Sequence, residues 1–139
     1  MSDSSEVDAA VIAALTNDAT LAALMTDGVW RDVAPQSKTK FVVVAQQDHV
    51  DRYVQTTAAY EEFVYLVKAV DANVSGSTVK TAAARIHTVL QDAALTITGY
   101  GLMLIERIER VAFTETDPDQ QDRRWQHRGG LYRVFVQPS

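Results

Sequence analysis

The chain has 139 residues, the size of one ordinary domain. Apolar residues make up 47% of it and charged residues 22%, a balance typical of folded globular proteins rather than disordered segments. Its 13 basic and 18 acidic residues give a formal net charge of −5, which argues against a dedicated nucleic-acid-binding protein. We therefore expect one domain over residues 1–139, with residues 1–5 frayed.

Two helices are predicted near the N-terminus. The first has an apolar stripe at helical spacing, formed by Val7, Val11, Ala14 and Leu15. Polar residues at 17–18 interrupt this helix. A second short helix follows over residues 19–25, and Gly28 ends it.

Short strands then lead into a long central strand. Residues 29–33 predict a strand closed by Pro35, and the continuous apolar run 41–45 predicts a buried strand. The polar stretch 49–57 predicts a hairpin loop. Residues 59–71 predict a long strand with apolar side chains on both faces, which is typical of a strand covered on both sides.

The remaining elements complete the sheet. A helix with one apolar stripe is predicted over residues 77–92, followed by a brief strand at 95–98 and a long strand at 101–116. A charged loop at 114–124 then leads to a last strand at 131–136. Together the elements predict an α+β fold, a single domain with a mixed, mostly antiparallel sheet of five or six strands and two main helices, in the order α-β-β-β-α-β-β-β.

Two modest helices cannot cover both faces of such a sheet. A bare apolar face larger than roughly a few hundred Å² is unusual in a monomer, so we expect self-association or docking. Nearby charged residues suit a polar interface rim. The candidate interface residues are Arg107, Glu109, Arg110, Asp122, Arg123, Arg124 and Trp125. The alternative is that they form a solvated strand end and loop.

The three histidines do not predict a metal site or a catalytic site. His49 and Asp51 form an H-x-D pair, but no second ligand pair lies at metal spacing. His87 borders an apolar helical stripe, where a packed or hydrogen-bonded histidine is the usual case. His127 is expected at the surface, at the end of a loop.

Other catalytic patterns are also missing from the sequence. There is no cysteine, no G-x-S-x-G motif and no phosphate-binding loop. The adjacent Glu61 and Glu62 point to opposite faces of a strand and cannot act together as acid and base. We therefore expect no catalytic residue, no cofactor and no bound metal.

Neither a membrane nor a nucleic acid is a predicted partner. The N-terminus MSDSSEVD is unlike a signal peptide, and no apolar run approaches the ~20 residues of a membrane helix. The basic segment 123–128 contains Trp125 and could bind nucleic acid by phosphate contacts and stacking. Aspartates directly upstream largely neutralise that segment, so nucleic-acid contact is the weaker interpretation.

Four patterns follow one another over residues 7–137. They are the opening VIAALTNDATLAALMTDGVWRDVAP, the FVVV strand, the long strand leading into TAAARIHTVLQDAALTITG, and LMLIERIERVAFTETDPD with the closing GGLYRVFV. In this arrangement the chain resembles the tail-completion (tail-terminator) proteins of siphophages. That family has no catalytic signature to match.

The resemblance implies a structural role at the head–tail junction of a virion, assembled in the host cytoplasm. Such proteins form hexameric rings that cap the tail tube, stop its polymerisation and present a surface to the head connector. The implied partners are further copies of the chain, the tail tube protein and the head–tail connector or stopper protein. DNA would pass through the lumen without sequence-specific binding, which suits an acidic protein.

Three other functions are compatible with the same residues. One is a head–tail stopper or neck adaptor. Another is a non-viral α+β ligand-binding or regulatory domain, which needs a pocket with convergent polar groups. The third is an enzyme, for which the sequence offers no catalytic constellation.

Overall fold

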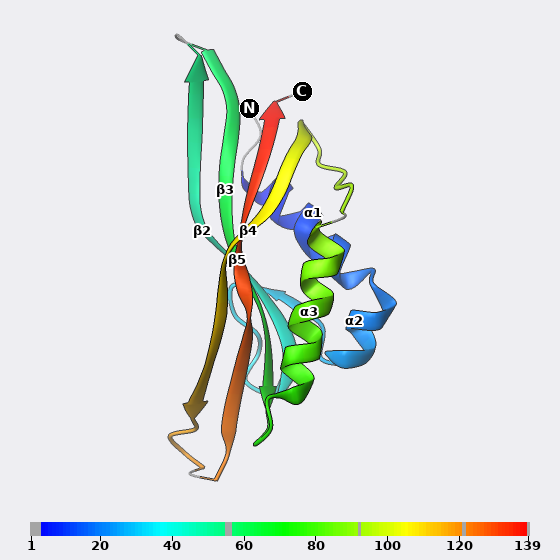
Figure 1. Cartoon of the computed structure of the whole chain (residues 1–139), viewed down its shortest axis with the longest axis vertical. Coiled ribbons are helices and arrows are strands. Elements are labelled where there is room, and N and C mark those ends of the chain that lie inside the picture. Colours follow the sequence, from blue (N-terminus) through cyan, green and yellow to red (C-terminus); the bar gives the residue numbers. More distant parts are fainter. Residues whose placement is uncertain (1–3, 55–56, 92, 121, 139) are drawn as a thin grey trace.

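A computed structural model describes residues 4–54, 57–91, 93–120 and 122–138 (Figure 1). The elements in chain order are α1 (Ser4–Thr16), α2 (Ala19–Leu24), β1 (Val29–Arg31), β2 (Lys40–Val54), β3 (Thr57–Ala72), α3 (Ser77–Gln91), β4 (Tyr100–Thr116) and β5 (Arg124–Pro138). The three helices pack on one face of a five-stranded sheet, so the molecule has two layers. The predicted α+β class is confirmed.

The sheet has the strand order β1-β2-β3-β5-β4. β1 and β2 pair in parallel and all other neighbours pair antiparallel, so the sheet is mixed and mostly antiparallel, as predicted. The predicted strand at 95–98 is wrong. That segment makes only the single bridge Ile97↔Tyr100 among the described residues. The chain turns back at Gly99 (φ 84°) directly after Ile97 makes this bridge.

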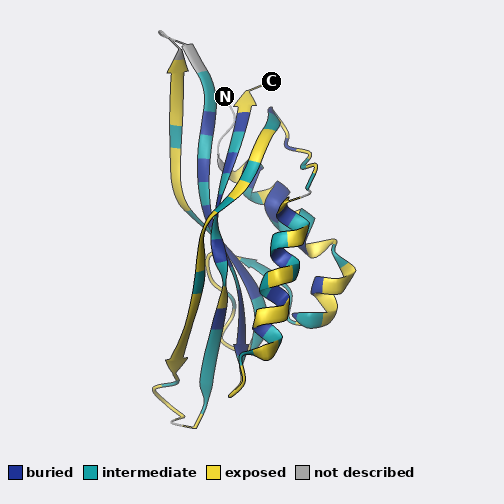
Figure 2. Cartoon of the chain, viewed as in Figure 1, coloured by how far each residue is buried: buried dark blue, intermediate teal, exposed yellow. Residues whose placement is uncertain are grey.

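The core lies between the helices and the near face of the sheet (Figure 2). Alternate residues of β3 are buried under the helices, namely Phe63, Tyr65, Val67 and Ala69. They meet the apolar stripe of α3, formed by Val79, Ala82, Ile86 and Leu90. Burying such a Val, Ile, Leu or Phe side chain contributes about 1.5–3 kcal/mol each. None of the described helices has the length and hydropathy needed to cross a membrane.

The N-terminal helix is held by packing and by one polar contact. α1 begins at Ser4, within the segment 1–5 that we expect to be frayed, and residues 1–3 lie outside the described part of the chain. The Tyr65 hydroxyl donates a hydrogen bond to the Asp8 carboxylate and so connects β3 to α1. Burial, more than this bond, raises the pKa of Tyr65 far above its usual value.

The strands extend past the helices at both ends of the sheet (Figure 1). The two projecting hairpins, β2–β3 at one end and β4–β5 at the other, are called the arms below. The predicted loop at 49–57 is wrong for residues 49–54, which belong to β2, and residues 55–56 lie outside the described part. The charged loop predicted at 114–124 is shorter in the structure, because β4 reaches Thr116 and β5 begins at Arg124. The strand predicted at 131–136 is present as the last part of the longer β5. Residues 51–53 of β2 and 112–116 of β4 are exposed in succession, so both faces of these segments meet water and need no apolar period.

Asp18 connects α2 to α3. Its carboxylate accepts a hydrogen bond from the Leu21 backbone N–H at 2.9 Å, which makes Asp18 the N-cap of α2. It also accepts two hydrogen bonds from the Arg85 guanidinium, at 2.6 and 2.8 Å. The bonds from Arg85 hold the pKa of Asp18 below its ordinary value of 3.8.

The variant Asp18→Asn tests this ion pair, because asparagine keeps the cap but loses the charge. A carboxyl group whose pKa is lowered by folding contributes its full stabilisation at pH values above 3.8, its ordinary pKa. This contribution is lost as the pH falls through the lowered pKa. We expect the melting temperature of Asp18→Asn to lie roughly a few degrees below wild type at pH 7. The difference should close in strong acid, as followed by circular dichroism. In an Arg85→Gln background, Asp18→Asn should have no further effect.

Gly129 lies in the middle of β5, opposite Lys68 of β3. A Cβ atom at this position would collide with the backbone of Val67 and Lys68. Such contacts cannot be relieved by a side-chain rotation. Glycine is therefore required for the close approach of these two strands.

We expect Gly129→Ala to lower the free energy of unfolding by about 1–3 kcal/mol or more, because the β3 backbone must move to admit the methyl group. Urea denaturation would measure this loss. Gly101→Ala is the matched control, since a Cβ there would meet only the Gln137 side chain, at 3.6 Å. Equal stability of Gly129→Ala and wild type would contradict the steric requirement.

Candidate assembly surfaces

The sheet face turned away from the helices, called the open face below, is covered by no helix or strand of the described chain (Figure 1). Three residues that the register places on this face, Val43, Val70 and His127, are nevertheless buried. Strand alternation places on it the apolar residues Val64, Leu66, Leu104, Phe113, Leu131 and Phe135. The exposed large side chains of β4 are Met103, Leu104, Ile108 and Phe113, at 51%, 49%, 41% and 46% of full exposure. Figure 2 shows this strand as largely exposed. Such a surface is typical of a protein contact site.

Charged residues lie among these apolar side chains and are largely paired. The Arg52 guanidinium binds the Glu62 carboxylate at 3.1 Å, and Arg133 lies 3.4 Å from Glu106. Lys68 is buried enough that the loss of hydration lowers its pKa. An apolar centre with charged groups around it is the usual composition of a protein interface.

Two strand edges lie open beside this face. β4 is an edge strand over its whole length, Tyr100–Thr116. At the other edge, β1 covers β2 only at Val42, Val43 and Val44. Among the described residues, the rest of the outer edge of β2 has no neighbouring strand. Such edges carry backbone N–H and C=O groups that can pair with another chain.

The predicted interface residues of β4 lie on two different faces. Arg107 and Arg110 face α3 and line a groove of about 480 Å³ together with Lys80 and Arg128. None of the described residues that line this groove carries a carboxylate. Glu109 lies on the open face instead, because its register partner in β5 belongs to that face. The sequence grouped these charges, but a register shift between Arg107 and Glu109 places Glu109 on the other face from both arginines.

The other predicted interface residues surround the loop between β4 and β5. Residues 122–124 border a cleft of about 460 Å³ between this loop and the turn that precedes α3. Trp125 packs against Phe41, with ring centroids 6.4 Å apart, and its indole N–H donates to Asp117 at 3.2 Å. Trp125 thus contributes to the packing of the hairpin, and the seven predicted residues do not form one patch.

His127 is buried, which corrects the predicted surface position. It lies within β5, stacks on Phe113 at 4.2 Å and is hydrogen-bonded to Glu115 at 2.8 Å. Burial lowers the pKa of His127, and the bond to Glu115 opposes this shift. The position differs because β5 begins earlier than the sequence indicated. His87 lies 3.3 Å from the Tyr132 hydroxyl and is the hydrogen-bonded histidine that was expected.

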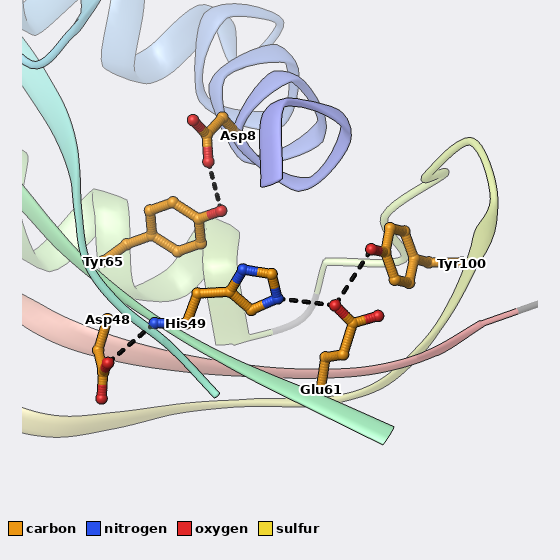
Figure 3. A network of polar contacts seen from close by, with 6 residues as sticks. All are labelled: Asp8, Asp48, His49, Glu61, Tyr65 and Tyr100. Carbon is orange, nitrogen blue, oxygen red and sulfur yellow. Dashed lines mark hydrogen bonds and ion pairs between the residues drawn. The ribbon is translucent and has the colours of Figure 1, made fainter. Parts of the chain in front are cut away.

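A polar network lies at the root of the β2–β3 hairpin (Figure 3). His49 Nε2 is 2.7 Å from Glu61 Oε1, and the Tyr100 hydroxyl donates to the same oxygen at 3.2 Å. Glu61 is buried on the helix side while Glu62 binds Arg52 on the open face, so the predicted opposition of these two glutamates is confirmed. The network contains no serine, threonine or cysteine that could act as a nucleophile.

Comparison with known proteins decides the family. The model of the family "Tail completion protein gp17" matches residues 9–137, which is nearly the whole chain. The chain belongs to this family. The predicted resemblance to tail-completion proteins is thereby confirmed. No curated protein is detectably similar in sequence.

Solved structures agree with membership of the tail completion protein gp17 family. A chain of the virion of a native gene transfer agent particle is 25% identical over 94% of each chain, with a TM-score of 0.71. A second solved structure is 14% identical over 100% of this chain and 99% of its own, with a TM-score of 0.59, and supports the fold alone. This tail completion protein is accordingly a structural tail protein, and the family gives no indication of catalysis.

The variant Leu104→Lys tests whether the open face of this tail completion protein mediates association. Leu104 is 49% exposed, so a lysine should leave the fold intact but place an unpaired charge in any interface on this face. We expect oligomer formation, measured by sedimentation velocity, to be lost. Val33→Lys is the matched control, because Val33 is 77% exposed in the segment between β1 and β2, outside the strands of the open face. Equal association of both variants would show that the open face is not an interface.

Proposed function

We propose that the protein caps the phage tail tube as a hexameric ring, ends tail polymerisation and forms the joint to the head connector. The observation that carries this proposal is the tail completion family match over residues 9–137. The similarity to a chain of a gene transfer agent virion supports a place in the assembled particle. The partners are other copies of this chain, the tail tube protein and the connector or stopper protein.

The open face and the two free strand edges support the formation of a ring. Contacts between unlike surfaces of identical subunits generate a ring when the rotation closes. The chain offers unlike surfaces, because the β4 edge and the outer edge of β2 lie on opposite sides of the sheet. The charged residues around Arg110 and Arg123 would form a polar rim or a docking surface for the tube or connector.

The charge of the protein is compatible with DNA passing through the ring. A strongly basic lumen would hold the phosphate backbone, because each phosphate contact releases counterions and strengthens binding. This chain has a net charge of −5. We therefore propose that DNA moves past the protein without sequence-specific binding.

Removal of the protein from the phage that encodes it tests this function. We expect overlong tails, because nothing would stop tube polymerisation, together with full heads that lack tails. Negative-stain electron microscopy of lysates would measure tail length and joining. A plasmid-borne wild-type copy should restore both, and the Leu104→Lys variant should not.

The same experiment separates the proposed function from that of a stopper. Tails of normal length that fail to join heads would assign the protein to the head–tail stopper or neck adaptor role. Normal tails joined to full heads in its absence would contradict both assignments.

A further inference from the structure

We propose that His49, Asp51 and Glu61 bind a divalent transition-metal ion at the root of the β2–β3 hairpin. This inference does not depend on the proposed tail function. The ligand atoms of the three side chains all lie within 4.8 Å of one another. One imidazole nitrogen and two carboxylates form a donor set that suits such ions.

The antiparallel register of β2 and β3 creates this cluster. Asp51 pairs directly with Glu61 across the two strands, and His49 lies two residues before Asp51, on the same face of the sheet. The H-x-D pair alone offers only two ligands. Glu61 supplies the third from ten residues further along the chain, at a spacing that no short metal motif contains.

The charges in the cluster favour a bound cation. Two carboxylates directly opposite each other on neighbouring strands repel and destabilise the pairing. Glu61 is only 7% exposed, which makes its negative charge costly without a compensating one. Among the described residues, no lysine or arginine forms an ion pair with Asp51 or Glu61, and His49 is charged only when it is protonated. A divalent ion would supply the missing positive charge.

Neighbouring side chains already orient two of the ligands, and Figure 3 shows one of these contacts, between Tyr100 and Glu61. The imidazole of His49 stacks on the Phe63 ring at 4.0 Å, with an interplanar angle of 18°. The Tyr100 hydroxyl donates to Glu61 Oε1 at 3.2 Å. Hydrogen bonds and packing of this kind hold metal ligands in place and raise the affinity of a site.

The separation of two of the ligands is somewhat shorter than in a metal site. His49 Nε2 and Glu61 Oε1 are 2.7 Å apart, whereas neighbouring ligand atoms around a tetrahedral zinc-type ion with bonds of ~2.0–2.2 Å lie ~3.4 Å apart. A small outward movement would therefore let the ion replace the hydrogen bond between them. Three protein ligands leave further positions for water or for a group of a partner chain. The ion would also join β2 to β3 where the hairpin leaves the body of the protein.

Titration of the metal-free, tag-free protein with Co²⁺ and Zn²⁺ tests the site. Visible absorption of Co²⁺ and isothermal calorimetry of Zn²⁺ should show one ion per chain, and the melting temperature should rise with added metal. Asp51→Asn and His49→Ala should each weaken binding by about 10-fold or more. Asp51 is exposed, so its variant should remain folded and should no longer gain melting temperature with metal.

Two matched controls use the same residue types outside the cluster. Asp48→Asn and His87→Ala should bind both ions as tightly as wild type, because neither residue belongs to the cluster. The absence of saturable binding up to about 1 mM metal would overturn the proposal. Equal losses of affinity in Asp48→Asn or His87→Ala would also overturn it, because the ion would then lie elsewhere.

Discussion

The rest of the structure depends on the fact that its helices cover only one face of the sheet. The helices bury the residues on one side of β3, including Phe63 and Tyr65. Val64 and Leu66 on the other side have no covering layer in the described chain. Hydrophobic stabilisation is proportional to the apolar area removed from water. The open face therefore retains apolar area that the described chain leaves in contact with water.

Strand length divides the molecule into a core and two arms. The part of the sheet beneath the helices is held by apolar packing. The two hairpins beyond it depend on backbone pairing and on polar contacts such as Arg52 with Glu62 and Trp125 with Asp117. Segments with few buried apolar contacts open more easily than the core. Both arms are therefore the parts of the chain expected to open most easily.

Adjacent residues of β3 lie on opposite faces of the sheet and contact different neighbours. Spacing in the sequence predicts the face on which a residue lies, but not the residues of other strands that it meets. The sequence placed Glu61 and Glu62 on opposite faces, because the period of a strand is two. It could not show that Glu61 meets His49 and Asp51, since that contact depends on the register of two strands. It also grouped the mixed charges Arg107, Glu109 and Arg110 by proximity, whereas a register shift between Arg107 and Glu109 directs them to two faces. No local signal in the sequence reports which strands become neighbours.

The sequence by itself determined the α+β class, the helix and strand types where apolar periodicity was strong, and the family. Apolar stripes at helical spacing and strands that are apolar on both faces indicate which side chains are buried. These elements could therefore be predicted without a structure. Only the tertiary structure decided the extent of the arms, the buried position of His127 and the separation of the predicted interface residues. Polar strand segments that are solvated on both faces look like loops in sequence, because backbone pairing alone defines them. The tertiary structure also decided that one face of the sheet is covered and the other open, because this depends on all three helices packing on the same side.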